Sequence, residues 1–135
     1  MKDITLKARI DNIPKVTAFI DGELEALECS VKAQMQIDVA IDELFGNIAR
    51  YAYGDEEGDA TVSFDFDADT RTALITFADW GKPFDPTAAA APDISTPAAE
   101  RRIGGLGIFL VRKTMDDMRY AYRDGKNILT VRKKI

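Results

Sequence analysis

Residues 73–84 read ALITFADWGKPF, an apolar run that passes directly into an aspartate, a glycine and a proline. The apolar half is typical of a strand near the centre of a sheet. Asp79 and Gly81 follow where that strand ends. An aspartate there can accept a hydrogen bond from an exocyclic amine, while the glycine admits a flat ring. The alternative is a plain turn, because Asp, Gly and Pro are common turn residues.

Strands and helices alternate on both sides of this segment. Alternation of apolar and polar residues predicts strands at 4–10, 61–66, 73–78, 119–122 and 127–131. Helical spacing and caps predict helices from Asn12 to about Cys29, from Ser30 to Gly54, and from Gly104 to Met118. A turn at Asp124-Gly125 joins the last two strands. This order predicts an α+β fold, a two-layer sandwich with helices on one face of a mixed sheet.

Composition restricts the chemistry that the chain can perform. Its 135 residues predict a single domain over residues 1–135. The chain has no histidine and one cysteine, which excludes a Ser/His/Asp triad, histidine-ligated zinc, a phosphoacceptor histidine and an internal disulfide. No apolar run approaches the roughly 18 residues that a membrane span needs. We therefore expect a cytoplasmic protein without membrane contact.

Charge is concentrated in two segments. Residues 54–100 carry a net charge of −9, whereas residues 101–135 carry ten basic and three acidic side chains. An acidic protein with one basic quarter is a poor candidate for direct nucleic-acid binding. A basic end beside a glycine-rich stretch favours a phosphate site. The simpler interpretation is that these charges occupy solvated faces of edge strands.

A second motif lies on the long predicted helix, where Glu43 and Asn47 are four residues apart and share a face. The amide oxygen of an asparagine is a hard ligand that suits Mg²⁺. The carboxylate of a glutamate can orient or deprotonate a nucleophile. Taken alone, such a pair is more often a solvated helix face, so the motif needs support from elsewhere in the chain.

A third motif is residues 104–112, GGLGIFLVR, which predicts a helix that opens on three glycines. Backbone N–H groups at a helix start bind anions, and glycines let a phosphate approach closely. The spacing matches neither a Walker A loop nor a dinucleotide-binding fingerprint. Arg101 and Arg102, just before it, favour a phosphate role over a flexible loop. Residues 82–103 hold four of the five prolines and predict a long surface loop.

In order and spacing, the three motifs resemble the N, G1 and G2 boxes of the GHKL ATPase superfamily, over roughly residues 35–131. A domain of this length is similar to the anti-sigma regulatory factor/serine-protein kinase family, of the RsbW and SpoIIAB type. The resemblance implies the Bergerat ATP-binding fold and implies ATP and Mg²⁺ as cofactors. It also implies an ATP lid at about residues 84–103.

The resemblance further implies a role for each matched residue. Glu43 would be the catalytic base or would orient the attacking group, and Asn47 would hold Mg²⁺. Asp79 would bind the adenine amine, with Gly81 against the ring. The residues that would contact phosphates, or in the case of the arginines a partner, are Arg101, Arg102, Gly104, Gly105, Leu106 and Gly107. Thr130 or Asn127 would lie near the phosphates, because the register of the last strand is open.

The implied function is that of an ATP-dependent serine protein kinase and anti-sigma partner switch. It would phosphorylate a small anti-anti-sigma (STAS-like) protein and hold a sigma factor. A homodimer is also implied, with the apolar stripe of the first helix and the N-terminal strand as candidate surfaces. Two alternatives stay open: a nucleotide-gated protein-binding module without kinase activity, and an α+β domain whose glycines serve only as turns.

Overall fold

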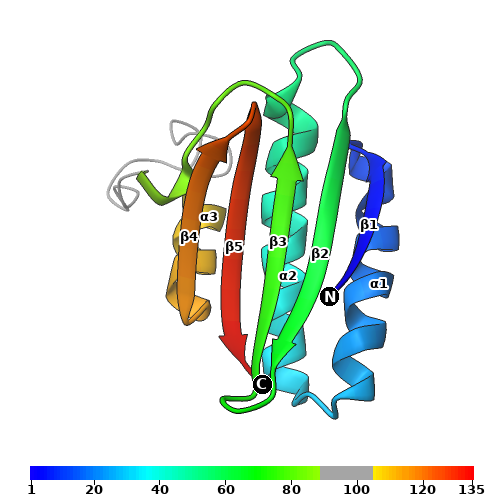
Figure 1. Cartoon of the computed structure of the whole chain (residues 1–135), viewed down its shortest axis with the longest axis vertical. Helices are drawn as coiled ribbons and strands as arrows, with labels where there is room; N and C mark the ends of the chain where they lie inside the picture. Colours follow the sequence, from blue (N-terminus) through cyan, green and yellow to red (C-terminus); the bar gives the residue numbers. More distant parts are fainter. Residues whose placement is uncertain (89–104) are drawn as a thin grey trace.

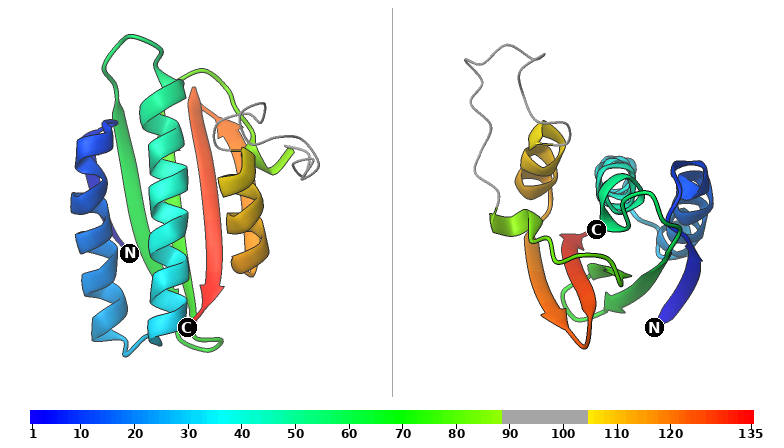
Figure 2. Two further views of the ribbon diagram at one scale, coloured as in Figure 1. Left: turned by 180° about the vertical axis from the view of Figure 1, so that it is seen from behind. Right: turned by 90° about the horizontal axis from the view of Figure 1, so that it is seen from above.

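The computed structural model describes residues 1–88 and 105–135. One sheet has the strand order β1-β2-β3-β5-β4, with bounds β1 (Lys2–Lys7), β2 (Asp59–Asp67), β3 (Thr72–Asp79), β4 (Asp117–Arg123) and β5 (Lys126–Lys134). The helices are α1 (Ile13–Ala26), α2 (Val31–Asn47) and α3 (Gly105–Thr114), and they lie on one face of the sheet (Figure 1, Figure 2). The predicted two-layer α+β sandwich is therefore confirmed.

The sheet differs from the prediction in one respect, because all four of its neighbouring strand pairs are antiparallel. The expectation of a mixed sheet was wrong for a topological reason. Two helices separate β1 from β2, so the chain re-enters the sheet in the opposite direction. The single helix α3 does make β3 and β4 run the same way, but β5 lies between them and is antiparallel to both.

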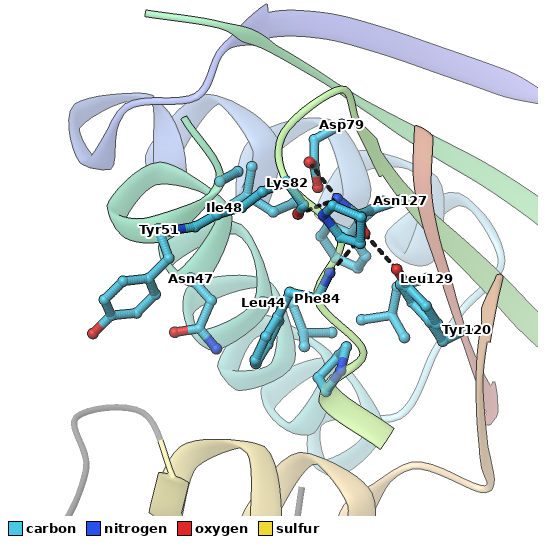
Figure 3. A pocket seen from close by; sticks show the side chains of 14 residues that line it. Leu44, Asn47, Ile48, Tyr51, Asp79, Lys82, Phe84, Tyr120, Asn127 and Leu129 are labelled. Carbon is cyan, nitrogen blue, oxygen red and sulfur yellow. Dashed lines mark hydrogen bonds between the residues drawn. The ribbon is translucent and has the colours of Figure 1, made fainter. Parts of the chain in front are cut away.

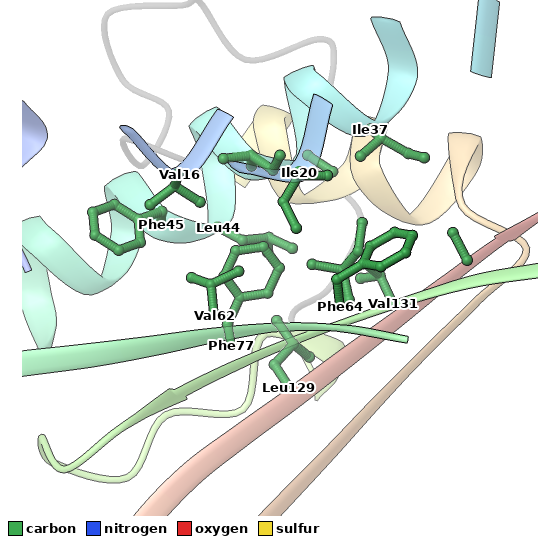
Figure 4. Packing of buried hydrophobic residues seen from close by; sticks show 14 of the residues in the cluster. Val16, Ile20, Ile37, Leu44, Phe45, Val62, Phe64, Phe77, Leu129 and Val131 are labelled. Atoms are coloured by element: carbon green, nitrogen blue, oxygen red, sulfur yellow. The ribbon is translucent and has the colours of Figure 1, made fainter. Parts of the chain in front are cut away.

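The core lies between the helices and the sheet. Figure 4 shows side chains from α1 and α2 packed onto those of the sheet. Fully buried members include Val16 and Ile20 of α1, Phe45 of α2, and Val62 and Phe77 of the sheet. Burial of each such side chain contributes about 1.5–3 kcal/mol. The apolar stripe of α1, one of the two candidate dimer surfaces, is thus part of the core.

The predicted side-chain cap is present at the start of α2 and absent at the start of α1. The Ser30 hydroxyl accepts the Ala33 N–H at 3.2 Å and caps α2, as predicted. Asn12 precedes α1, but its amide Nδ2 donates to the Lys7 carbonyl at 2.8 Å instead of capping. The second helix was expected to reach Gly54. Its α-helical part ends at Asn47 and continues as a π-helical turn, η2 (Ile48–Ala52), so the helical stretch stops just before Gly54. The φ of Gly54 is 62°, as expected for a glycine that ends a helix.

The third helix was expected to run to Met118 and ends at Thr114. Met118 belongs to β4, where it pairs with Val131 of β5. The hairpin that makes this pairing turns at Asp124 and Gly125, whose φ angles are 54° and 77°. Both values are those of the predicted two-residue turn. Within the described ranges, no helix combines the length and the apolar character that crossing a membrane demands.

Candidate functional site

A pocket of about 130 Å³ opens between the C-terminal part of α2 and the end of β3 (Figure 3). Its walls are mostly apolar and come from α2, η2, β3, β4, β5 and the segment after β3; they include Leu44, Ile48, Phe77, Phe84, Pro86 and Leu129. Polar groups of Asn47, Asp79, Tyr120 and Asn127 also border it. An apolar cavity with a few convergent polar groups is the usual form of a small-molecule site.

Asp79 is the last residue of β3 and is 4% exposed. Its Oδ1 accepts the Gly81 N–H at 2.9 Å and the Asn127 amide Nδ2 at 3.0 Å. Both hydrogen bonds to this carboxylate from the described residues thus reach one oxygen. The second oxygen, Oδ2, keeps its lone pairs for a ligand donor. A hydrogen bond from an exocyclic amine to Asp79 stays a prediction.

Asn127 fixes the segment that follows Asp79. Its Nδ2 also donates to the Lys82 carbonyl at 3.0 Å. Its Oδ1 accepts the Phe84 N–H at 3.0 Å and the Tyr120 hydroxyl at 2.5 Å (Figure 3). One side chain, itself 7% exposed, therefore holds residues 79–84 at three points: Asp79, Lys82 and Phe84. A network with all its members paired stays rigid.

The register of β5 shows which of the two residues that the sequence left open, Asn127 or Thr130, lies at the pocket, while a contact of Asn127 with phosphate stays a prediction. Asn127 pairs with Asp79, and Thr130 pairs with Thr76 three positions along. Because successive side chains of a strand point to opposite faces, these two residues face different sides of the sheet. The Thr130 and Thr76 hydroxyls lie 3.0 Å apart on the face without helices. The structure brings Asn127 to the pocket and leaves Thr130 away from it.

A neighbouring backbone segment leaves no room for a side chain at position 81. A Cβ at this position would overlap the carbonyl group of Ala52 in η2. The same carbonyl oxygen accepts the Lys82 N–H at 3.1 Å. The close approach of two backbone segments therefore explains the glycine. A ligand ring against Gly81 stays a prediction.

Glu43 and Asn47 occupy one face of α2, with Asn47 Nδ2 donating to Glu43 Oε1 at 3.3 Å. Burial raises the pKa of Glu43, against the opposing effects of this hydrogen bond and of Arg50. Asn47 Oδ1 is buried and has no hydrogen-bond partner in the part of the chain that the structure describes. Buried polar atoms normally have partners. An orphaned amide oxygen at the pocket wall fits the ligand chemistry of Mg²⁺.

The first turn of α3 packs against Glu43. Its Gly107 leaves no room for a Cβ, which would overlap the Glu43 carboxylate. Gly105 begins the helix, and Leu106 follows it in the same turn. Backbone N–H groups of a first helical turn attract anions. The Glu43 carboxylate therefore lies against the first turn of α3.

Arg101, Arg102 and Gly104 lie outside the described residues. So do residues 89–103 of the predicted lid. For the lid, only residues 84–88 are described, and they contain the short helix η3 (Pro86–Ala88).

Sequence reasoning missed several residues that shape the pocket. Tyr120 of β4 lines it and bonds to Asn127. Phe84 and Leu129 supply part of the apolar wall. The alternation of β4 and β5 marks Tyr120 and Leu129 as inward-facing, but only the pairing of the strands shows which inward side chains meet.

Residues 6–133 match the family described as histidine kinase-like ATPase domain. The serine-protein kinase RsbW of Listeria monocytogenes is 30% identical over 105 residues, which is 74% of this chain and 66% of that protein. The serine/threonine-protein kinase BtrW of Bordetella bronchiseptica is 28% identical over 102 residues, 76% of this chain and 71% of that protein. This chain thus spans slightly less than two thirds of the Listeria relative.

Among solved structures, the histidine kinase AdeS of Acinetobacter baumannii superposes with a TM-score of 0.52 at 14% identity. The match covers 99% of this chain and 68% of that chain. At this identity the likeness supports the fold alone.

Proposed function

Because the chain belongs to the histidine kinase-like ATPase domain family, we propose that its pocket binds ATP and that it phosphorylates a serine of a protein partner. One arrangement carries the proposal: α2 holds Glu43 and Asn47 between the pocket that ends at Asp79 and the first turn of α3. A nucleotide with its base at Asp79 would direct its phosphates toward that pair. The likeness to RsbW and BtrW, which are named as protein kinases, supports the transfer step.

At the base end, Asp79 Oδ2 accepts a hydrogen bond from the exocyclic amine of adenine. The apolar walls, among them Ile48 and Leu129, contact the ring faces and exclude water. Asn127 and the Gly81 N–H keep Oδ1 occupied, so the free oxygen has one orientation. Adenine is thus recognised by a single carboxylate oxygen of Asp79 in an apolar cavity.

At the phosphate end, Asn47 is the residue that would hold Mg²⁺, through its Oδ1, and the ion would neutralise charge on the phosphates. Backbone N–H groups of the first turn of α3, with Gly105 and Gly107, receive phosphate oxygens. Arg101, Arg102 and Gly104 belong to the same end in the proposal. Thr130 is left out, because its hydroxyl lies beside Thr76.

Glu43 is the proposed base. Its carboxylate takes the proton of the serine hydroxyl while the serine oxygen forms a bond to the γ-phosphorus. The bond from that phosphorus to the bridging oxygen breaks, and ADP leaves with the electron pair. Burial raises the pKa of Glu43, which makes it a stronger base than a solvated glutamate.

The proposed protein substrate is a small anti-anti-sigma (STAS-like) protein, and the proposed second partner is a sigma factor. Such a switch acts in the cytoplasm through proteins rather than through direct contact with nucleic acid. A second copy of the chain is a further proposed partner. The N-terminal strand β1 suits that role, because it is an edge strand of the sheet.

The proposal is tested by transfer of labelled γ-phosphate from ATP to a cognate anti-anti-sigma protein. Glu43→Gln and Asn47→Ala are expected to lower the rate by about 100-fold or more. Gly22→Ala is the control, because nothing lies within 4 Å of a Cβ at Gly22. Normal transfer by both site variants would contradict the assignment. ATP binding without transfer, but with partner affinity that depends on the nucleotide, would favour the binding-module alternative.

A further inference from the structure

Tyr53 joins three parts of the site that are distant in the sequence. It is the first residue after η2, and η2 itself continues directly from α2, the helix that carries Glu43 and Asn47. Its hydroxyl donates to the Asp59 carbonyl at 2.5 Å and accepts the Trp80 N–H at 2.8 Å. Trp80 is the residue after Asp79. One side chain therefore ties the end of the α2 segment to the start of β2 and to the end of β3.

The ring of Tyr53 is fixed as firmly as its hydroxyl. It lies over Gly58, where a Cβ would overlap the ring atoms. Burial raises the pKa of the Tyr53 hydroxyl, so this group stays protonated at neutral pH and can donate to Asp59. Ring and hydroxyl together hold the side chain in one place.

The loop after Asp79 is held from two sides. On the β5 side, Asn127 bonds to Asp79 and to the Lys82 carbonyl. On the η2 side, the Ala52 carbonyl accepts the Lys82 N–H. Among the described residues, the Tyr53 hydroxyl is the one side-chain group on the η2 side that bonds to this loop. On the η2 side, it is thus the contact with this loop that a single substitution can remove.

We propose that Tyr53 is a positioning residue, which sets the Asp79 carboxylate at a fixed distance from the Glu43 and Asn47 pair. The inference rests on the proposed function, in which one nucleotide spans both ends. A nucleotide bound at two points makes its full set of contacts only when the two ends of the site keep the right spacing, so a looser loop at Asp79 is expected to weaken ATP binding. Without the hydroxyl, the Trp80 N–H would donate to water instead, and the loop after Asp79 would move more freely on the η2 side.

The direct test is Tyr53→Phe, which removes the hydroxyl and keeps the ring over Gly58. Tyr122→Phe is the matched control, because Tyr122 is 46% exposed and does not line the pocket. Trp80 is the only tryptophan in the sequence, so tryptophan fluorescence reports on this loop. Gly58→Ala is a second variant, which displaces the ring and keeps the hydroxyl. Like Tyr53→Phe, it is expected to speed exchange of the Trp80 amide and to raise KM for ATP.

In the nucleotide-free protein, Tyr53→Phe is expected to speed exchange of the Trp80 amide by about tenfold. Acrylamide quenching of Trp80 fluorescence should increase as well, and Tyr122→Phe should change neither. In the transfer assay, KM for ATP is expected to rise about fivefold while kcat stays within about twofold. A merely structural defect would instead lower the active fraction, and with it kcat, at unchanged KM.

The outcomes separate this inference from the proposed function. A folded wild type that binds no ATP contradicts the proposed function, and the positioning role falls with it. A wild type that binds ATP beside a Tyr53→Phe variant with the same KM contradicts the positioning role alone. Unchanged exchange and quenching of Trp80 in the variant would show that the hydroxyl does not hold the loop, which also overturns the inference.

Discussion

Gly107 in the first turn of α3 lies so close to Glu43 of α2 that a Cβ at Gly107 would overlap the Glu43 carboxylate. The absence of a side chain here brings a helix start against the proposed base. A carboxylate at the N-terminal end of a helix is favoured by the helix dipole. The same end attracts phosphate oxygens. The two helices thus meet at the point where proton transfer and phosphate binding are proposed to occur.

The first prediction concerns this contact. Gly107→Ala is expected to displace either Glu43 or the start of α3, and to lower phosphoryl transfer by about tenfold or more. Overpacking should also cost about 1–3 kcal/mol of unfolding free energy. Transfer rates and thermal melting measure the two effects.

Gly22→Ala is the matched control for that prediction. Gly22 lies within α1, is exposed, and has nothing within 4 Å of a Cβ. Alanine there should raise stability by about 0.5–1 kcal/mol and leave transfer unchanged. If Gly107→Ala also left transfer unchanged, the contact with Glu43 would have no part in the reaction.

The second prediction concerns the orphaned oxygen of Asn47. Asn47→Ala removes the only Mg²⁺ ligand that we propose from the described residues, so Mg²⁺ should no longer strengthen ATP binding in this variant. In the wild type, titrations of ATP with and without Mg²⁺ should differ by about tenfold or more in affinity. An equal Mg²⁺ effect in wild type and variant would rule out Asn47 as the ligand.

The third prediction is the pH dependence of transfer. Glu43 must be deprotonated to accept the serine proton, and burial raises its pKa. The rate should therefore rise with pH through a pKa above that of an ordinary glutamate. Glu43→Gln should remove this rise along with most of the activity. A rate that does not depend on pH over the acidic range would contradict Glu43 as the base.

The fourth prediction concerns stability and two carboxyl groups between α1 and α2. Asp21 and Asp38 each bury an oxygen, Oδ1, that has no hydrogen-bond partner among the described residues. Burial, followed by the hydrogen bond and charge of Asp21, raises the pKa of Asp38 to about 7. The folded protein thus binds this proton more tightly than the unfolded chain does.

A carboxyl group with a raised pKa in the folded state makes unfolding easier as pH rises. The free energy of unfolding should fall between pH 3.8, the ordinary pKa of an aspartate, and about 7. Asp38→Asn should remove this part of the pH dependence and stabilise the protein above pH 7. Asp42→Asn, on the exposed side of the same helix, is the control. If denaturant titrations gave parallel pH profiles for wild type and Asp38→Asn, protonation of Asp38 would not be the cause of this pH dependence.

Features that depend on neighbouring residues in the sequence were predicted well. The Ser30 cap and the turn at Asp124 and Gly125 need only a few residues to specify them, and both are confirmed. Glu43 and Asn47 do share a face of α2, because helical geometry alone places residues four apart together. Strand β3 and the aspartate at its end were likewise found from the pattern.

Features that depend on which elements meet were not predictable. Whether Asn127 or Thr130 reaches the pocket depends on the β3–β5 register, which the alternation of either strand alone does not specify. The insertion of β5 between β3 and β4 turned an expected mixed sheet into an antiparallel one. The bond between Tyr53 and Trp80 joins residues 27 apart, and no local pattern indicates it.

The most direct test of the account is calorimetric titration of ATP with Mg²⁺ into the wild type and Asp79→Asn. Asparagine can keep an oxygen for Gly81 and Asn127, but it replaces Oδ2 with an NH₂ group that meets the adenine amine donor to donor. We predict binding by the wild type and an affinity lower by about tenfold or more in the variant. Asp65→Asn, at an exposed position of β2, should bind like the wild type. No binding by a folded wild type, or equal binding by Asp79→Asn, would contradict the account.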